Sequence, residues 1–288
     1  MVTQILKLYK TVYIVEDIIH NKVLMNKLLS NGIIKVDSID EIPDGSAVMF
    51  SAHGVSPQMV KQAEKKELTI IDSTCPVVKD LQNKVKEKSD NGYSIIIIGN
   101  RAHQEVVALL GYANNDNVYV VNNEMDIDLL PDLTGKKVAY FTQTSMYPDD
   151  IQPIIDSLKA KIPNIESNSI HNICEATLER QAVIKAIAPS IDLLLVVGSS
   201  YSSNTMSLVR AGIASGIGQV MRIDSEDELN LDLFKDTENI AITGATSTPE
   251  DIINEVIDYL KNNLEITVQE FPSSNPIEES INADEQGS

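Results

Sequence analysis

The chain has 288 residues and a formal net charge of −19, from 23 basic and 42 acidic residues. This charge argues against nucleic acid or an anionic membrane surface as a partner, because both attract clustered Lys and Arg. The chain is 43% hydrophobic but has no apolar run near the roughly 18 residues of a membrane span, so we expect a soluble cytoplasmic protein with a large core.

Short apolar runs alternate with helical patterns along almost the whole chain. Several runs are apolar on both faces, as are strands of a parallel sheet that helices cover on both sides. The expected strands cover 13–19, 47–53, 68–74, 93–100, 118–123, 137–145, 192–200, 219–224 and 239–247. Expected helices between them include 56–66, 76–88 and 248–263. Repeated βα units of this kind predict an α/β protein with parallel sheets.

The strands divide the chain into thirds of similar make-up, with three expected strands in each. We expect three small α/β domains, over residues 1–75, 76–171 and 172–264. Each is too small for a full doubly wound domain, but three could pack around a shared centre. Residues 265–288 are acidic and polar, contain Pro and Ser, and are expected to form a largely disordered tail.

Polar residues follow several expected strands, where parallel α/β sheets bind their ligands. Three of the four histidines, His20, His53 and His103, lie in such places, and hydroxyl-rich segments follow the strands that begin at 137, 192 and 239. If these loops open at one face, they form a polar pocket with few cations that suits an anion such as a phosphate.

Each of these residues also has a simpler explanation. A histidine after a strand is more often a polar loop residue than a ligand. Helix capping explains Ser56, Ser203 and Thr248 without any ligand. The prediction of a site therefore depends on so many polar residues occurring together at the ends of the expected strands. The three histidines could instead hold a single metal ion in a hydrolase, but the Ser- and Thr-rich strand ends add no further metal ligand.

An acid and two cysteines stand at expected helix starts. Glu105 follows His103 by two residues, so it either makes a favourable contact with the helix dipole, worth ~0.3–1 kcal/mol, or passes protons beside the histidines. Cys75 and Cys174 each precede a helix, where the dipole favours the thiolate. A lone cysteine is most often a small apolar residue, but two at equivalent places in successive thirds suggest a shared metal or cluster.

Eight short motifs, in this order, resemble the 4-hydroxy-3-methylbut-2-enyl diphosphate reductase family, over about Tyr13 to Asn263. They are IIHNKVL (18–24), FSAHGVS (50–56), DSTCPVV (72–78), AHQEV (102–106), TQTS (142–145), ICEAT (173–177), VVGSSYSSN (196–204) and TGATSTPE (243–250). The resemblance implies three similar α/β domains about a pseudo-threefold axis, each giving one cysteine to a central [4Fe–4S] cluster. The open iron binds the substrate's hydroxyl, which leaves as water and yields isopentenyl and dimethylallyl diphosphate.

The resemblance also implies roles for particular residues. Cys75 and Cys174 match two cluster ligands, Glu105 matches the proton-relay acid, and Thr144 matches the hydroxyl residue beside the substrate's alcohol. His103 is expected to bind substrate and to take part in catalysis. The residues expected to bind the diphosphate substrate are His20, His53, His103, Thr144, Ser202, Ser203, Asn204 and Ser247. The implied electron donor is a ferredoxin or flavodoxin.

One family feature is missing from this sequence. The family's first cysteine lies in a Gly-Phe-Cys-type turn well ahead of the His-Asn pair, and His20 is too near Met1 to leave room for that segment. We expect that the chain begins late and that the reading frame before Met1 encodes such a turn. The alternative is a non-catalytic paralogue that binds a diphosphate ligand without a stable cluster.

Overall fold

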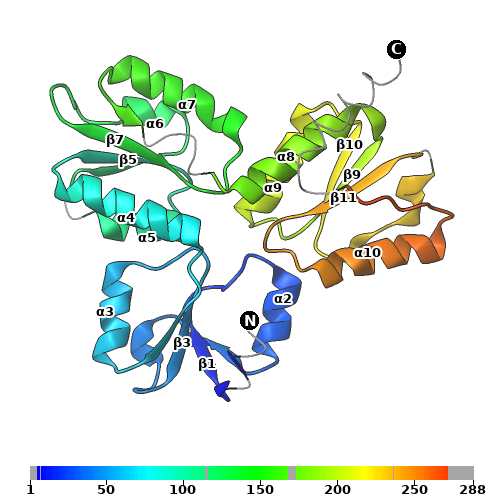
Figure 1. Ribbon diagram of the computed structural model, residues 1–288, viewed down its shortest axis with the longest axis horizontal. Coiled ribbons are helices and arrows are strands. Elements are labelled where there is room, and N and C mark those ends of the chain that lie inside the picture. Colours follow the sequence, from blue (N-terminus) through cyan, green and yellow to red (C-terminus); the bar gives the residue numbers. More distant parts are fainter. Residues whose placement is uncertain (1–4, 7, 114–115, 168–172, 236, 272–288) are drawn as a thin grey trace, which may run out of the picture. The chain divides into compact units, whose positions relative to one another are not determined.

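The computed structural model describes residues 5–6, 8–113, 116–167, 173–235 and 237–271 (Figure 1). The chain forms two compact units. The first contains Met1–Ile19 and Met25–Ile173, and the second contains His20–Leu24 and Cys174–Ser288. The described residues form three sheets in which every strand pair is parallel. The α/β class with parallel sheets is therefore confirmed.

The first sheet lies in the first unit and has the strand order β2-β1-β3-β4. Its strands are β1 (Val12–Ile14), β2 (Ile33–Lys35), β3 (Ala47–Phe50) and β4 (Thr69–Asp72), and the nearby helices are α2 (Lys22–Leu29) and α3 (Pro57–Lys65). Ser56 begins α3 as predicted, because its hydroxyl accepts a hydrogen bond from the Met59 N–H. Val48 and Phe50 of β3 pack with Ala63 of α3 in the core beside this sheet.

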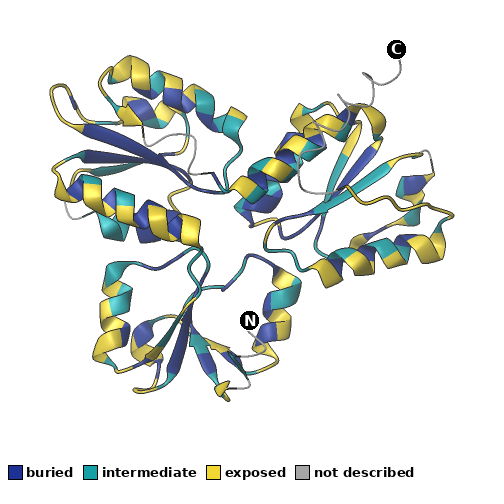
Figure 2. Ribbon diagram, viewed as in Figure 1, coloured by how far each residue is buried: buried dark blue, intermediate teal, exposed yellow. Residues whose placement is uncertain are grey.

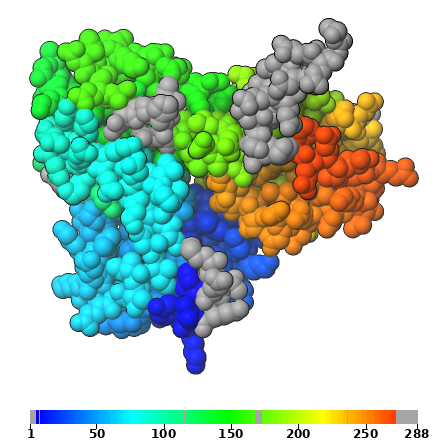
Figure 3. All heavy atoms as spheres, in the orientation of Figure 1, coloured from blue at the N-terminus to red at the C-terminus, as the bar shows by residue number. Residues whose placement is uncertain are grey.

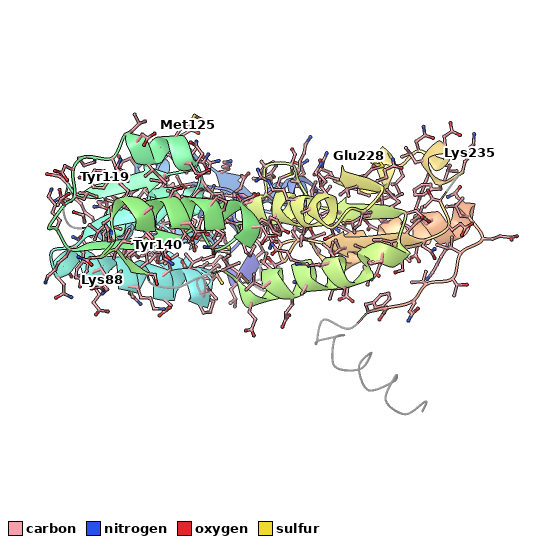
Figure 4. All side chains as sticks on the ribbon, turned by 90° about the horizontal axis from the view of Figure 1, so that it is seen from above. Lys88, Tyr119, Met125, Tyr140, Glu228 and Lys235 are labelled. Carbon is pink, nitrogen blue, oxygen red and sulfur yellow. The ribbon has the colours of Figure 1, made fainter. Side chains whose placement is uncertain are left out.

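The second sheet, also in the first unit, has the order β6-β5-β7-β8. Its strands are β5 (Ser94–Ile98), β6 (Val118–Val121), β7 (Val138–Thr142) and β8 (Glu166–Ser167). Its helices are α4 (Pro76–Asp90), α5 (Gln104–Tyr112), α6 (Glu124–Asp128) and α7 (Pro148–Lys161). Lys88 of α4 and Met125 of α6 lie on opposite sides of this sheet (Figure 4). Helices thus cover both faces, and β5 and β7 are buried throughout (Figure 2).

The helices α4 and α5 share one face of the second sheet. Leu81 and Val85 of α4 pack with Leu109 of α5 against Ile97 and Phe141 of the strands. The opposite face of α4 is largely exposed and forms part of the surface of the first unit (cyan in Figure 3). Because α4 packs on this sheet, the position of Cys75 at the start of α4 is fixed relative to the sheet.

The third sheet forms the second unit and has the order β10-β9-β11. Its strands are β9 (Leu193–Val197), β10 (Gln219–Ile223) and β11 (Ile240–Gly244), and its helices are α8 (Glu175–Ile187), α9 (Ser203–Ala214) and α10 (Glu250–Asn263). Val256 and Leu260 of α10 pack against Leu195 and Val197 of β9. A Cβ on Gly212 would lie 2.6 Å from Leu194 Cδ2, so this glycine allows α9 to approach β9 closely.

All nine predicted strands are present, with shorter bounds, and two more were missed. The missed strands are β2 and β8, which have three and two residues and lie at sheet edges. The division into three domains stays a prediction, although each predicted third contains one sheet. Residues 265–271 of the predicted tail are exposed and lie outside any helix or strand, and the rest of the tail lies outside the described residues. Among the described residues, every helix is too short or too polar to cross a membrane.

Two predicted helix caps are wrong. Ser202, rather than Ser203, caps α9, and its hydroxyl accepts a hydrogen bond from the Thr205 N–H at 3.3 Å. Pro249 stands at the cap position of α10, and the Thr248 hydroxyl instead donates to the Val197 carbonyl at 2.8 Å. The Thr248 hydroxyl therefore bonds to a carbonyl of β9 and does not cap α10.

Candidate functional site

His103 stands at the start of α5, just beyond the end of β5. Its Nδ1 accepts a hydrogen bond from the Glu105 N–H at 3.2 Å, so the imidazole caps this helix. Because Nδ1 is the acceptor, a neutral His103 carries its proton on Nε2. Both side chains are nearly inaccessible, with 8% of His103 and 1% of Glu105 exposed. The predicted catalytic pair is thus positioned by a single helix start.

Thr144 follows β7, which neighbours β5 in the sheet. The carboxyl of Glu105 accepts a hydrogen bond from the Thr144 N–H at Oε1 (2.7 Å) and another from Thr144 Oγ1 at Oε2 (2.8 Å). Burial raises the pKa of Glu105 to about 7, because the two hydrogen bonds from Thr144 offset only part of the desolvation. Near neutral pH the carboxyl therefore exists in both protonation states, which suits a group that transfers protons.

His53 lies beside His103 in the first unit. The two ring centroids are 5.3 Å apart, and the rings are perpendicular. The loop that carries His53 is held by a hydrogen bond of 3.0 Å from the Cys75 N–H to the Ala52 carbonyl. The next residue, Gly54, has φ +76, a conformation that favours glycine. The first unit therefore brings together His53, His103 and, through the start of α5, Glu105 with its partner Thr144.

In the second unit, hydroxyl and amide groups follow β9 and β11. The Asn204 Nδ2 donates to Thr246 Oγ1 at 2.6 Å, which joins the two loops. Asn204 Oδ1 is buried and has no hydrogen-bond partner among the described residues. If the amide turned over, Oδ1 would accept from Thr246 and the NH₂ group would be available to an anion. Ser203 is the first residue of α9, and Ser247 lies half-buried between β11 and α10.

His20 belongs to the second unit, together with residues 21–24. Its ring lies 5.5 Å from the Tyr201 ring in an edge-on arrangement, with an angle of 67° between the planes. Its neighbour Asn21 is 1% exposed and accepts a hydrogen bond from the Leu24 N–H at 2.9 Å. Asn21 thereby caps α2 and orders the chain next to the predicted diphosphate ligand His20.

The two cysteines have the same local setting. Cys75 is the N-cap of α4 and Cys174 is the N-cap of α8, and both are free thiols with intermediate exposure. Neither side chain makes a capping hydrogen bond. A helix N-terminus stabilises a thiolate, which is the form that binds metals. The prediction of two equivalent helix starts is confirmed, and the role of both thiols as ligands stays a prediction.

Several polar residues near these side chains were not predicted, among them Tyr201, Ser199 and Asp224. Ser199 is 1% exposed and donates to Asp224 Oδ1 at 2.7 Å. Asp224 is the last residue of the predicted strand 219–224, so the strand-end criterion that found the histidines would have found it as well. Nothing in the sequence marks its pairing with Ser199, which lies 25 positions away.

The fold and these side chains define a parallel α/β protein with hydroxyl-rich strand ends and a buried acid that titrates near neutrality. The family model described as "LytB protein" matches residues 1–261, and the chain belongs to the LytB family. It is similar to the 4-hydroxy-3-methylbut-2-enyl diphosphate reductase of Ehrlichia ruminantium (strain Welgevonden), with 38% identity over 91% of this chain and 79% of that protein. The reductase of Rhodopirellula baltica is 35% identical over 89% of this chain and 80% of its own length.

Solved structures agree with this assignment. The structure of the E-1-hydroxy-2-methyl-but-2-enyl-4-diphosphate reductase from Plasmodium falciparum covers 99% of this chain, and 92% of that chain is matched, with a TM-score of 0.86 and 33% identity. A second structure, of (E)-4-hydroxy-3-methyl-but-2-enyl diphosphate reductase, described as the terminal enzyme of the non-mevalonate pathway, matches with a TM-score of 0.66 and 28% identity. It covers 91% of this chain, and 92% of that chain is matched. The family resemblance drawn from the eight motifs is thereby confirmed.

Proposed function

We propose that the protein reduces 4-hydroxy-3-methylbut-2-enyl diphosphate to isopentenyl and dimethylallyl diphosphate. The reaction takes up two electrons and two protons, breaks the bond between carbon and the hydroxyl oxygen, forms a C–H bond and releases water. Family membership supports the substrate. The single observation that carries the proposal is the buried Glu105, with its pKa near 7 and both carboxyl oxygens bonded to Thr144.

Glu105 and Thr144 are assigned to delivery of the proton that leaves in water. When Glu105 is protonated at Oε2, that O–H donates to Thr144 Oγ1, and the Thr144 hydroxyl is then free to donate onward to the substrate's hydroxyl oxygen. Passage of a proton along these two groups leaves Glu105 ionised, with its charge stabilised by the Thr144 N–H. His103 is assigned to hold the start of α5, and with it the backbone of Glu105.

The diphosphate is assigned to His20, His53, His103, Ser202, Ser203, Asn204 and Ser247. Hydroxyl, amide and imidazole N–H groups are hydrogen-bond donors that suit phosphate oxygens. The start of α9 adds backbone N–H groups and the positive end of a helix dipole. Thr144 is assigned to the substrate's alcohol.

The residues present fit a [4Fe–4S] cluster in part. Cys75 and Cys174 would hold it as two thiolates, each at a helix N-terminus, but the sequence has only two cysteines where the resemblance implies three. When bound, such a cluster supplies the electrons and a Lewis-acidic iron. We propose a ferredoxin or flavodoxin as the electron donor.

The hydroxyl and amide groups that follow β9 and β11 also fit one other function, a diphosphate-binding protein without a stable cluster. One experiment separates the two. The full chain is reconstituted with iron and sulfide without oxygen, its iron and sulfide are measured, and it is then supplied with a chemical reductant and the substrate. About four irons per chain and formation of both products support the reductase. Pyrophosphate binding without bound iron or turnover supports the binding protein.

Zinc analysis of the purified protein tests the hydrolase alternative, with His20, His53 and His103 as ligands. His103 Nδ1 already accepts the Glu105 N–H, so this residue offers a metal only Nε2. Stoichiometric zinc together with phosphate release from the substrate would support a hydrolase instead of a reductase.

A further inference from the structure

Residues His20–Leu24 belong to the second unit, whereas the chain on either side of them belongs to the first. Val23 packs against the core around β9 and α10, which fixes the apolar side of this short segment. Asn21 caps α2 within the segment itself. Neither contact explains how the polar end of the segment, which carries His20, is oriented on the second unit.

A hydrogen bond to Ser199 supplies that orientation. Lys22 is the first residue of α2, and its backbone N–H donates to Ser199 Oγ at 2.9 Å. The first N–H groups of a helix have no acceptor within the helix, so a partner from elsewhere in the fold must satisfy them. Ser199 comes two residues after β9 and is 1% exposed, so its hydroxyl has little access to water as a competing partner.

Asp224 determines which way the Ser199 hydroxyl points. Ser199 Oγ donates to Asp224 Oδ1 at 2.7 Å. A serine hydroxyl can both donate and accept, whereas an ionised carboxylate can only accept. The carboxylate therefore directs the hydroxyl hydrogen toward itself and leaves a lone pair of Oγ for the Lys22 N–H.

Arg222 keeps the carboxylate in place. Its Nη1 lies 2.9 Å from Asp224 Oδ2 and donates to the Gly198 carbonyl at 3.3 Å, while Nη2 lies 3.4 Å from Glu228. Arg222 lies in β10 and Asp224 directly follows that strand, so the guanidinium and the carboxylate meet where the strand ends. Burial raises the pKa of Asp224, but hydrogen bonds from Ser199 and Arg222 outweigh it and hold that pKa below its usual value, so the group is ionised at neutral pH.

We propose that Asp224, acting through Ser199, is a positioning residue for His20. Asp224 and Ser199 fix the first N–H of α2, at Lys22, and so hold the imidazole of His20, two residues earlier, edge-on to Tyr201. The connection between His20 and diphosphate binding rests on the proposed function, whereas the connection between Asp224 and Lys22 does not.

Amide hydrogen exchange of the full chain, resolved at Lys22 by NMR, tests the inference with D224N, S199A and the double variant. In D224N the new amide can donate to Ser199, so the hydroxyl no longer has a fixed direction. We expect Lys22 exchange to become about tenfold faster in each single variant, with a change in the His20 ring resonances. We expect no further increase in the double variant, because both changes break the same connection.

The control is D232N, which makes the same change at an exposed carboxylate paired with Lys235 and leaves the contacts of Ser199 and Asp224 intact. Its Lys22 exchange should match that of the unsubstituted protein. Unchanged exchange in D224N, or a double variant that exchanges much faster than S199A, would overturn the inference. If D224N does not fold, S199T and S199A test the hydrogen bond to Lys22 instead. Thr keeps the hydroxyl, so Lys22 exchange should be slow in S199T and fast in S199A. Fast Lys22 exchange in S199T would contradict the positioning role of the Ser199 hydroxyl.

Binding of inorganic pyrophosphate to the same variants separates this inference from the proposed function. Fast Lys22 exchange with weaker pyrophosphate binding supports both. Fast Lys22 exchange with unchanged pyrophosphate binding supports the positioning role and contradicts the assignment of His20 to the diphosphate.

Discussion

Glu105 receives two hydrogen bonds from one residue, Thr144, with the backbone N–H at 2.7 Å from Oε1 and the hydroxyl oxygen at 2.8 Å from Oε2. This pairing fixes the plane of a fully buried carboxyl and joins the segments that follow β5 and β7. Because one of the two partners is a hydroxyl, the acid has a neighbour that can pass its proton on.

Replacement of Thr144 tests the hydroxyl. T144V retains the backbone N–H to Oε1 but removes the group through which the proton is proposed to pass. We expect kcat to fall by about 10²-fold through the loss of proton transfer, with a smaller rise in KM because the contact with the substrate's alcohol is lost as well. Steady-state rates of the reconstituted protein measure this. T144S, which keeps the hydroxyl, is the control, and a T144S variant as slow as T144V would argue against the role.

The raised pKa of Glu105 predicts a pH dependence of stability. Below about pH 4.5 the carboxyl is protonated in both the folded and the unfolded chain, and its contribution to stability is fully present. As the pH rises through about 7, the unfolded chain ionises first and that contribution is lost, by roughly 3 kcal/mol.

The variant E105Q cannot ionise, and it can still bond to both groups of Thr144. Urea unfolding of both proteins at pH 5 and pH 8 should therefore show the difference in unfolding free energy moving in favour of E105Q at the higher pH. A difference that is the same at both pH values would mean that the pKa of Glu105 is not raised.

The glycine next to His53 gives a prediction about stability. Gly54 and Gly92 have nearly equal positive φ values, +76 and +77, so G54A and G92A should share a backbone cost of about 1–2 kcal/mol. A Cβ at Gly54 would also lie 2.1 Å from Gln82 Nε2, whereas nothing lies within 4 Å at Gly92. We expect G54A to cost about 1–3 kcal/mol more than G92A in chemical denaturation.

A second substitution identifies the cause of that extra cost. Q82A removes the side chain that a Cβ at position 54 would meet, so adding it to G54A should recover part of the loss. If G54A and G92A proved equally costly, contact with Gln82 would not be what requires glycine beside His53.

A negative charge at Asn204 should weaken binding of a diphosphate. In N204D the carboxylate can still accept a hydrogen bond from Thr246, so the link between the loops is kept, but the charge repels phosphate oxygens. We expect at least about a tenfold increase in the Kd of pyrophosphate, measured by calorimetry. Q219E places the same charge at the exposed start of β10 and should leave the Kd unchanged. Equal affinities in N204D and Q219E would contradict the assignment of Asn204.

Sequence patterns predicted local structure well, that is, strands and helix starts formed by residues close together in the chain. Apolar runs gave nine strands, because buried parallel strands such as β5 and β9 leave a continuous apolar signal. The edge strands β2 and β8 were not predicted, because each has two exposed residues and lacks a continuous apolar run. The helix start at Cys75 was predicted because the following Pro76 is a local signal.

Contacts between distant residues were not predictable from those patterns. Lys22 and Ser199 are 177 positions apart, and Glu105 and Thr144 are 39 apart, yet each pair shares a hydrogen bond. The motifs placed Glu105 and Thr144 in the site but could not show that both carboxyl oxygens bond to one residue. Nor could they show that Thr248 would bond to the Val197 carbonyl instead of capping a helix.

The role of Glu105 as the acid is tested most directly by the rate of product formation in E105Q. The full chain and E105Q are reconstituted in parallel, and isopentenyl and dimethylallyl diphosphate are quantified under the same reductant, with pyrophosphate affinity measured on both proteins. We expect equal affinities and a product rate lower in E105Q by about 10²–10⁴-fold. A rate in E105Q equal to that of the unsubstituted protein, at equal iron content, would contradict it.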